Sequence, residues 1–274
     1  MTLREKEGTD QKKHWGKTYA DNPAFFGESP SEFAQTSVDL FRREGIRKIL
    51  EIGCGHGRDT LLFAKEGFDV LALDYSEEGL GILSGRAEEA GLSHQVATQV
   101  FDVRKPLPFP DGSFDACYSH MLLCMELSTE ELKFLLGEIH RVLKPGGLAL
   151  YSVRNTFDKH YGAGTRKSEE MYEIGGFVVH FFSEEKARSL SSGYEVREIR
   201  RMQEGSLPRE LYAVALKKTD LDARSENANK GGNMADSMGK YEEFFHDVYH
   251  TGVLDGKTKH LVALAASLAA GCES

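Results

Sequence analysis

The chain has 274 residues, of which 40% are hydrophobic and 28% charged, and its formal net charge is −9. This length and apolar content suffice for one large hydrophobic core with a small additional segment. The acidic balance argues against nucleic acid as a partner, and no apolar run is long enough to predict a membrane span.

Cysteine usage and the start of the chain bear on its compartment. None of the four cysteines forms a C-x-x-C pair, and residues 1–14 contain no apolar signal core. These patterns favour a reducing compartment, so we expect a cytoplasmic protein. His246 and His250 are spaced as in some zinc sites, but no third ligand is evident and we expect no metal.

Residues 1–45 are predicted to form an N-terminal helical cap. A helix over residues 11–20 places Trp15 and Tyr19 on one face, and a second helix begins at Ser31. The loop between them carries Phe25 and Phe26. These aromatic side chains either pack on the sheet or close over a ligand, and the sequence does not decide between the two.

A strand over residues 49–52 is followed by Gly53, Gly55 and Gly57 and then by a helix pattern over residues 59–65. A strand, a glycine turn and a helix N-terminus together bring a ligand against bare backbone. The spacing fits neither the dinucleotide fingerprint G-x-G-x-x-G nor the phosphate loop. It does fit E-x-G-x-G-x-G, beginning at Glu51.

The next strands deliver acidic residues to the same edge of the predicted sheet. The run over residues 68–73 ends in Asp74, about twenty residues past the turn, where this geometry places a ribose-binding carboxylate. Asp74 also suits a helix cap, and one residue can fill both roles. A strand over residues 94–101 then leads to Asp102 and Val103.

A fourth strand begins with F-D at residue 114 and ends at Ser119, so His120 falls at the ligand-binding edge. An amphipathic helix over residues 129–143 is stopped by K-P-G-G, and a fifth strand covers residues 148–153. Residues 157–179 are too long for a simple connection, which predicts a lid or binding loop or a solvent-exposed loop. Residues 194–201 and 210–216 are predicted to form an antiparallel pair.

The glycine motif, Asp74, Asp102, F-D and K-P-G-G together make residues 1–218 resemble the class I S-adenosylmethionine-dependent methyltransferases, and the small-molecule, tellurite-resistance-like type among them. The resemblance implies an α/β fold, with a Rossmann-like seven-stranded mostly parallel sheet and helices on both faces. It implies S-adenosyl-L-methionine as cofactor. The cofactor-binding residues it implies are Glu51, Gly53, Cys54, Gly55, Gly57, Asp74, Tyr75, Asp102, Val103 and Ser119.

The expected function is methyl transfer from the sulfonium to a small molecule by in-line displacement, in which the protein supplies proximity and orientation. A base is needed only if the acceptor arrives protonated, and His120, His160 and His180 are the candidates. We expect Arg154, Tyr161 and Arg166 to bind the substrate. The arginines favour an anionic substrate, through charge-assisted bonds.

Two other functions stay open. A nucleotide-binding oxidoreductase is disfavoured by the glycine spacing, and binding of S-adenosylmethionine or NAD would distinguish it. A protein that binds S-adenosylmethionine without turnover is distinguished only by an activity assay.

The C-terminal part has a different character. Residues 219–237 are predicted to be a polar linker, and residues 238–274 a short C-terminal helical segment. The latter is similar to the start of alkylhydroperoxidase D-like domains, where Cys272 matches the first cysteine of a redox pair. The resemblance implies an incomplete domain. One hypothesis is that a selenocysteine stands at position 275. We also expect that these helices could self-associate.

Overall fold

The computed structural model describes residues 3–22, 25–205 and 209–219, and the chain divides into two units, Met1–Thr219 and Asp220–Ser274. The predicted C-terminal helices and Cys272 lie outside the described residues, as does the linker beyond residue 219. The helical segment, the linker and the redox role of Cys272 therefore stay predictions. Within the described ranges, no helix is both long and apolar enough to span a bilayer.

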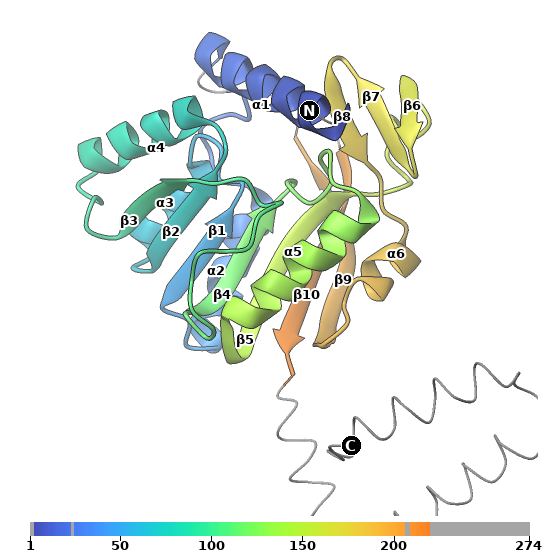
Figure 1. The fold of residues 1–274 in the computed structure, drawn as a ribbon. Helices are drawn as coiled ribbons and strands as arrows, with labels where there is room; N and C mark the ends of the chain where they lie inside the picture. Colours follow the sequence, from blue (N-terminus) through green and yellow to red (C-terminus); the bar gives the residue numbers. More distant parts are fainter. Residues whose placement is uncertain (1–2, 23–24, 206–208, 220–274) are drawn as a thin grey trace, which may run out of the picture. The chain divides into compact units, whose positions relative to one another are not determined.

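A seven-stranded sheet forms the centre of the first unit, in the order β3-β2-β1-β4-β5-β10-β9 (Figure 1). The first five strands pair in parallel, and β10 is antiparallel to both of its neighbours. The predicted seven-stranded, mostly parallel sheet is therefore confirmed. The strands are β1 (Lys48–Ile52), β2 (Asp69–Asp74), β3 (Val96–Val100), β4 (Phe114–His120), β5 (Leu143–Arg154), β9 (Tyr194–Glu204) and β10 (Arg209–Lys218).

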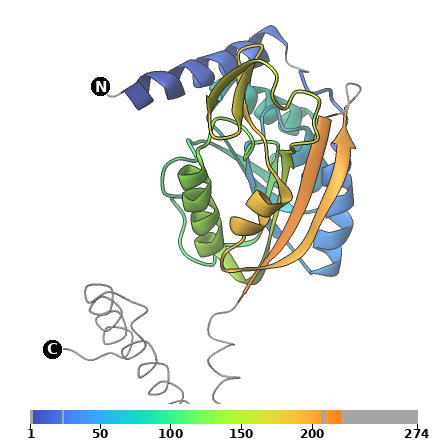
Figure 2. The ribbon, with the colours of Figure 1, turned by 90° about the vertical axis from the view of Figure 1, so that its right-hand side faces the viewer.

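Helices cover both faces of this sheet, as expected for parallel strands that are apolar on both sides. Figure 2 shows α5 on one side of the sheet and α2 on the other. Ile49, Leu50 and Ile52 of β1 are fully buried between the layers. The covering helices are α2 (Glu32–Arg43), α3 (Arg58–Lys65), α4 (Glu77–Glu89), α5 (Thr129–Val142) and α6 (Glu184–Ser189).

Serine side chains fix where several of these helices begin. Ser31 accepts a hydrogen bond from the Ala34 N–H, as predicted for the start of α2. At the start of α5, Ser128 and Glu131 form a reciprocal capping box, which leaves no ambiguity about where the helix starts.

The segment over residues 157–179 differs from the prediction of an irregular loop. It contributes most of a separate three-stranded antiparallel sheet: β6 (Thr165–Ser168), β7 (Met171–Ile174) and β8 (Phe177–His180). Gly175 and Gly176 both have positive φ and connect β7 to β8, which is the hairpin turn that a Gly-Gly pair favours. That pair, placed between apolar residues, is the local signal for the hairpin.

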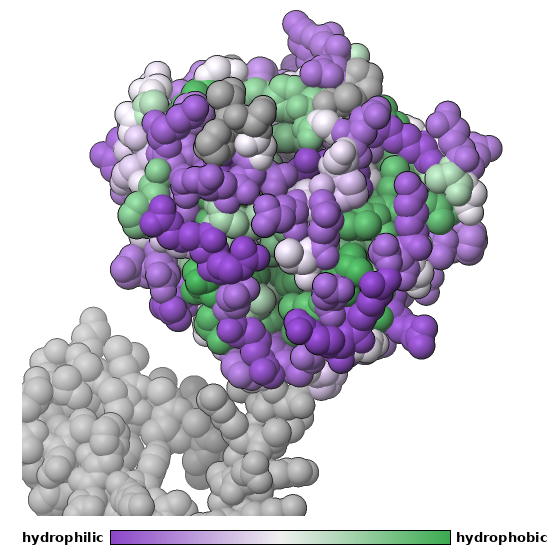
Figure 3. All heavy atoms as spheres, turned by 180° about the vertical axis from the view of Figure 1, so that it is seen from behind, coloured by the Kyte–Doolittle hydropathy of each residue, from purple (hydrophilic) through white to green (hydrophobic). Residues whose placement is uncertain are grey.

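The helix α1 (Leu3–Asp21) lies across the carboxyl ends of the parallel strands, from α4 to the small sheet (Figure 1). Of the region predicted as a cap, α1 stands over the ligand-binding edge of the fold, whereas α2 covers a face of the main sheet. From behind, the described surface is mainly hydrophilic, with apolar side chains in separate patches (Figure 3).

Candidate functional site

A cavity lies between α1 and the carboxyl ends of the parallel strands. Its volume is about 1120 Å³ when the open mouth is included. A second hollow of about 520 Å³ shares Trp15, Gly53, Asp74 and Tyr75 with it. Because the two hollows share these walls, they form one continuous site.

The glycine turn forms part of the floor of the cavity. Gly53 and Gly55 line it with φ of 77° and 56°, in the left-handed region that favours glycine. A Cβ on Gly55 would stand 2.5 Å from the Tyr19 hydroxyl oxygen. Gly57 also has positive φ, but the nearest atom to a Cβ there is Cδ1 of Leu83 at 2.2 Å, so this glycine serves helix packing.

Asp74 lies at the carboxyl end of β2 and lines both hollows. Its carboxylate accepts the N–H of Gly55 at 2.9 Å and the N–H of Ser76 at 2.8 Å. Burial raises the pKa of Asp74, and these backbone hydrogen bonds partly oppose that effect. The residue thus holds the glycine turn and the start of α4 together while it faces the cavity, which is consistent with both predicted roles.

Three residues predicted to bind cofactor lie outside the lining of both hollows: Glu51, Gly57 and Ser119. Glu51 is buried and accepts the Thr60 hydroxyl at 2.6 Å. Ser119 is also buried and donates to the carbonyl of Ile52 at 2.9 Å. Both hold the strand ends in place beneath the turn. Cys54 does line the cavity, and burial raises the pKa of its thiol.

Asp102 and Val103 line the second hollow, as does Tyr75. The Asp102 carboxylate accepts two hydrogen bonds from the Arg104 guanidinium, both at 2.9 Å. Burial alone would raise the pKa of Asp102, but the hydrogen bonds and charge of Arg104 outweigh it and lower that pKa. Asp102 is therefore ionised at the wall of this hollow, and its carboxylate is shared with Arg104.

Aromatic side chains of the cap form the opposite wall. Trp15 stacks on Tyr19, with ring centroids 5.7 Å apart, and on Phe26 at 5.8 Å. Phe177 of β8 lies 4.7 Å from Trp15, and Phe25 completes the group. All five line the cavity, so their position fits closure over a ligand, one of the two interpretations that the sequence left open.

Polar groups gather where β4, β5 and the β9–β10 hairpin meet the cavity. Arg154 pairs with Asp158, with the closest contact at 2.5 Å, and its Nη2 lies 2.7 Å from Nδ1 of His160. Nδ1 of His120 lies 2.7 Å from the Ser152 hydroxyl. Burial lowers the pKa of His120 to about 4, so its ring is neutral at pH 7.

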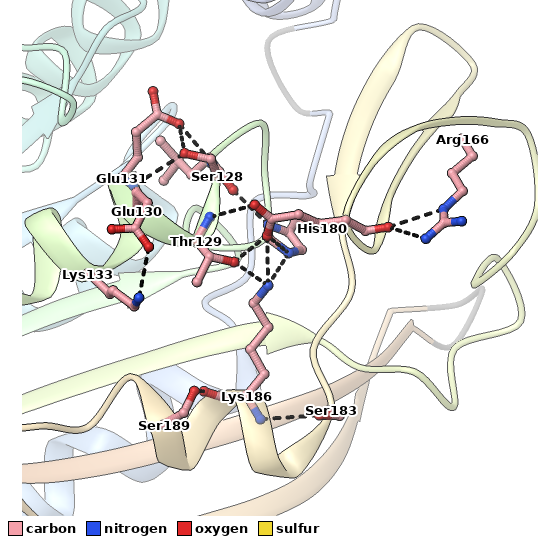
Figure 4. Close-up of polar contacts among 12 residues, drawn as sticks. Ser128, Thr129, Glu130, Glu131, Lys133, Arg166, His180, Ser183, Lys186 and Ser189 are labelled. Atoms are coloured by element: carbon pink, nitrogen blue, oxygen red, sulfur yellow. Dashed lines mark hydrogen bonds and ion pairs between the residues drawn. The ribbon is translucent and has the colours of Figure 1, made fainter. Parts of the chain in front are cut away.

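Three of the residues predicted for catalysis or substrate binding do not line the cavity. His180 is fully buried beyond it, with Nδ1 2.7 Å from the Leu127 carbonyl and Nε2 2.5 Å from Nζ of Lys186 (Figure 4). Arg166 donates to the Glu169 carbonyl in the same view. Tyr161 is exposed and donates to Glu170. The catalytic prediction for His180 and the substrate predictions for Arg166 and Tyr161 are thus not supported. His180 and Arg166 pair into the small sheet, and Tyr161 precedes that sheet in the chain.

Four polar residues of the cavity were not predicted as site residues: His56, Arg58, Asp59 and Arg209. His56 is an x position of the glycine motif, which carries no fixed chemistry, and Arg58 and Asp59 follow the motif. Arg209 is the first residue of β10, and no local pattern connects it to the glycine turn.

Known proteins with similar sequences support a methyltransferase domain. Residues 49–147 match the family model described as "Methyltransferase domain". An uncharacterized methyltransferase of Synechocystis is 34% identical over 102 residues, which cover 37% of this chain and 44% of that protein. The malonyl-[acyl-carrier protein] O-methyltransferase of Erwinia billingiae is 35% identical over 121 residues, which cover 43% of each. The chain spans less than half the length of these relatives.

Solved structures show the same fold. The 1,6-didemethyltoxoflavin-N1-methyltransferase of Burkholderia thailandensis, solved with S-adenosylhomocysteine, aligns with a TM-score of 0.64 at 17% identity. The alignment covers 80% of this chain and 92% of that one. An S-adenosylmethionine-dependent methyltransferase of Methanosarcina mazei aligns with a TM-score of 0.57 at 24% identity, over 63% of this chain and 92% of that one. The described unit therefore has the fold of these methyltransferases, and residues 49–147 match a methyltransferase-domain model.

Proposed function

We propose that this chain binds S-adenosyl-L-methionine in the two joined hollows and transfers its methyl group to a small molecule. The observation that carries the proposal is the meeting of three features in one place. Gly53 and Gly55 present bare backbone, Asp74 presents a buried carboxylate, and Trp15 stands over both. The domain match over residues 49–147 gives this arrangement its chemical meaning.

The cofactor would occupy the hollows in a fixed direction. Asp102 and Val103 line the smaller hollow and would take the adenine, while Asp74 would accept from the ribose hydroxyls. The glycine turn would hold the methionine part, with the acceptor in the larger hollow.

The bound cofactor supplies an activated methyl, so the chain's own task is to bind, orient and exclude water. Trp15 and Phe177 cover the cavity and would keep water from the reacting atoms. A base is required only for an acceptor that arrives protonated. Of the three predicted histidines, only His120 and His160 line the cavity.

The test is turnover by the full chain with S-adenosylmethionine and a panel of small acids, phenols and thiols. We expect S-adenosylhomocysteine and a methylated product from at least one acceptor, detected by mass spectrometry. Binding of S-adenosylhomocysteine without any product would favour the non-catalytic alternative. Binding of NAD in place of S-adenosylhomocysteine would favour the oxidoreductase. The fold alone does not decide, since a [4+2]-cyclase aligns with a TM-score of 0.54 at 19% identity.

We also propose that the methyltransferase is of the tellurite-resistance-like type and that the protein is cytoplasmic. The C-terminal segment would be alkylhydroperoxidase D-like and would self-associate. TehB of Haemophilus influenzae aligns with a TM-score of 0.53 at 17% identity, which supports the fold and not the type. The natural gene's nucleotide sequence after the codon for Ser274 tests the hypothesis of a selenocysteine at position 275.

A further inference from the structure

One end of the cavity, away from Asp74 and Asp102, presents three hydrogen-bond donors: Arg209, His120 and His160. We call them the donor cluster. Arg209 begins β10, His120 ends β4, and His160 follows β5, so the three come from separate parts of the chain. The proposed methyl transfer leaves their purpose open.

Three arginines and three carboxylates lie near the donor cluster. Arg58 pairs with Glu204 at 3.1 Å and lies 3.9 Å from Asp59, and Arg154 pairs with Asp158. Arg209 lies opposite Glu204 in the β9–β10 register, yet its side chain makes no hydrogen bond or ion pair with any residue that the structure describes. Its guanidinium lies 5.8 Å from the ring centre of Phe26.

Among the described residues, Arg209 is the one of these three arginines without a direct carboxylate partner. Burial and the charge of Arg154 lower its pKa, although the charges of Glu204 and Asp158 oppose that effect. A partly buried guanidinium without a direct partner favours an anionic group that reaches it in the cavity.

The hydrogen bonds of His120 favour one tautomer of its ring. The Ser152 hydroxyl oxygen accepts the Met121 N–H at 3.1 Å, and the acceptor within reach of its own proton is Nδ1 of His120 at 2.7 Å. When this hydroxyl donates to Nδ1, the ring proton resides on Nε2. This atom is buried without a hydrogen-bond partner, and its nearest carboxylate oxygen, on Glu204, is 3.9 Å away.

The hydrogen bonds of His160 favour the same tautomer. Nη2 of Arg154 is always a donor, and it lies 2.7 Å from Nδ1 of His160, closer than the Asp158 oxygen at 3.2 Å. Nδ1 is then the acceptor, and the ring proton is again on Nε2. Both histidines thus offer donors rather than proton acceptors.

The groups that could accept from a ligand at this end are already engaged. Asp59 lines the cavity, but its carboxylate oxygens accept from the Ser31 N–H, the Ser31 hydroxyl and the Tyr118 hydroxyl. The cavity therefore selects an acceptor of hydrogen bonds at this end.

The wall next to the donor cluster is aromatic. Phe26 stacks on Trp15 with an interplanar angle of 25°, whereas Phe25 is edge-on to Trp15 at 89° and Phe177 is tilted at 54°. An apolar group would bury against these rings.

We propose that the substrate is a carboxylate with an apolar body, whose carboxylate is bound by Arg209 and Nε2–H of His120 while its apolar part lies against Trp15, Phe26 and Phe177. This inference rests on the proposed methyl transfer and adds the class of its substrate. His120 is then a binding residue and not a base.

The experiment uses the full chain saturated with S-adenosylhomocysteine and compares indole-3-acetate with indole-3-acetamide, and benzoate with benzamide, by calorimetry and ligand-observed NMR. We expect each acid to bind at least about tenfold more tightly than its amide, because charge-assisted bonds to a guanidinium are lost in the amide. Arg209→Gln should remove the preference. Arg197→Gln is the matched control, since Arg197 is exposed on β9 and pairs only with Glu195 at the surface.

His120 gives an independent readout. His120→Leu should weaken the acids, and His120→Gln, which keeps a donor, should restore part of the affinity. Equal binding of acid and amide, absence of acid binding, or an undiminished preference in Arg209→Gln would overturn the proposal. Because every titration starts from a chain that has bound S-adenosylhomocysteine, these failures are distinct from failure of the methyltransferase proposal.

Discussion

Glu51 on β1 is a buried carboxyl whose protonation affects stability. Burial, reinforced by the negative charges of Asp59 and Asp74, raises its pKa to about 8, although the hydrogen bond from Thr60 opposes the shift. The folded chain therefore keeps a proton on Glu51 between about pH 4.5 and pH 8, where the unfolded chain has released it. This group's contribution to stability is complete below pH 4.5 and is lost as the pH rises through 8.

We predict that Glu51→Gln reduces this loss of stability at alkaline pH, because glutamine is neutral and keeps an acceptor for Thr60. Urea unfolding of wild type and variant at a series of pH values measures the effect. Glu130→Gln is the control, since Glu130 is an exposed partner of Lys133. Parallel pH profiles for wild type and Glu51→Gln would show that Glu51 is ionised in the folded chain.

Asp74 is the residue on which cofactor affinity should depend most. We predict that Asp74→Ala weakens S-adenosylhomocysteine binding by about 1.5–3 kcal/mol, tenfold or more, since hydrogen bonds to an ionised group are lost. Asp69→Ala is a matched control, because Asp69 is the exposed residue at the other end of β2. Calorimetry that gives the same affinity for Asp74→Ala and wild type would exclude Asp74 from the site.

Residues whose role follows from local backbone chemistry were predicted from the sequence. Gly53 and Gly55 are needed because positive φ excludes most side chains, and Asp74 follows from the length of one strand–helix–strand unit. Arg209 was not predicted. Its approach to the cavity depends on the register of β10 with β5 and β9, which no local pattern encodes.

The helix α1 covers the site, and the fluorescence of its Trp15 should respond to a ligand bound there. The chain has one tryptophan, and this side chain lines both hollows. We predict that S-adenosylhomocysteine changes the tryptophan fluorescence, because a ligand in the hollows replaces water next to the indole. Trp15→Phe should lose the signal while calorimetry still detects binding. Binding without a fluorescence change in wild type would place the cofactor elsewhere.

The small sheet is fastened to the main fold by a buried polar network. Nζ of Lys186 donates to Thr129 at 2.8 Å, to Glu169 at 3.2 Å and to His180 at 2.5 Å (Figure 4). Burial lowers the pKa of His180, so its ring accepts this bond in the neutral form. The network joins β8, α6, the β6–β7 turn and the start of α5.

We predict that Lys186→Met costs about 1–3 kcal/mol of stability, because buried acceptors lose their donor. Hydrogen exchange should accelerate in residues 165–180, with S-adenosylhomocysteine affinity nearly unchanged. Lys133→Met is the control, since Lys133 makes only an exposed i,i+3 pair. Unchanged exchange in the small sheet would mean that the network does not hold it.

The elements of the main sheet were predictable because each combined a buried apolar run with a clear stop signal. Ser31, Ser76 and Ser183 cap helices where the sequence placed their starts. Residues 157–179 were misjudged as a loop because strands of four residues give too short an alternation to recognise. The placement of His180, Tyr161 and Arg166 depended on that error.

For the whole molecule, the central question is which cofactor binds in the joined hollows. The fold and the domain match favour S-adenosylmethionine, and the proposed methyl transfer depends on that cofactor. The smaller hollow, with Asp102 and Val103, would hold the adenosine, and the larger one would hold the reacting groups. A chain that preferred a dinucleotide would contradict this division of the site.

The most direct measurement is calorimetric titration of the full chain with S-adenosylhomocysteine and, separately, with NAD. The account predicts one saturable site for S-adenosylhomocysteine that Asp74→Ala weakens and Asp69→Ala does not, and no comparable binding of NAD. Absence of S-adenosylhomocysteine binding, or tighter binding of NAD, would contradict it.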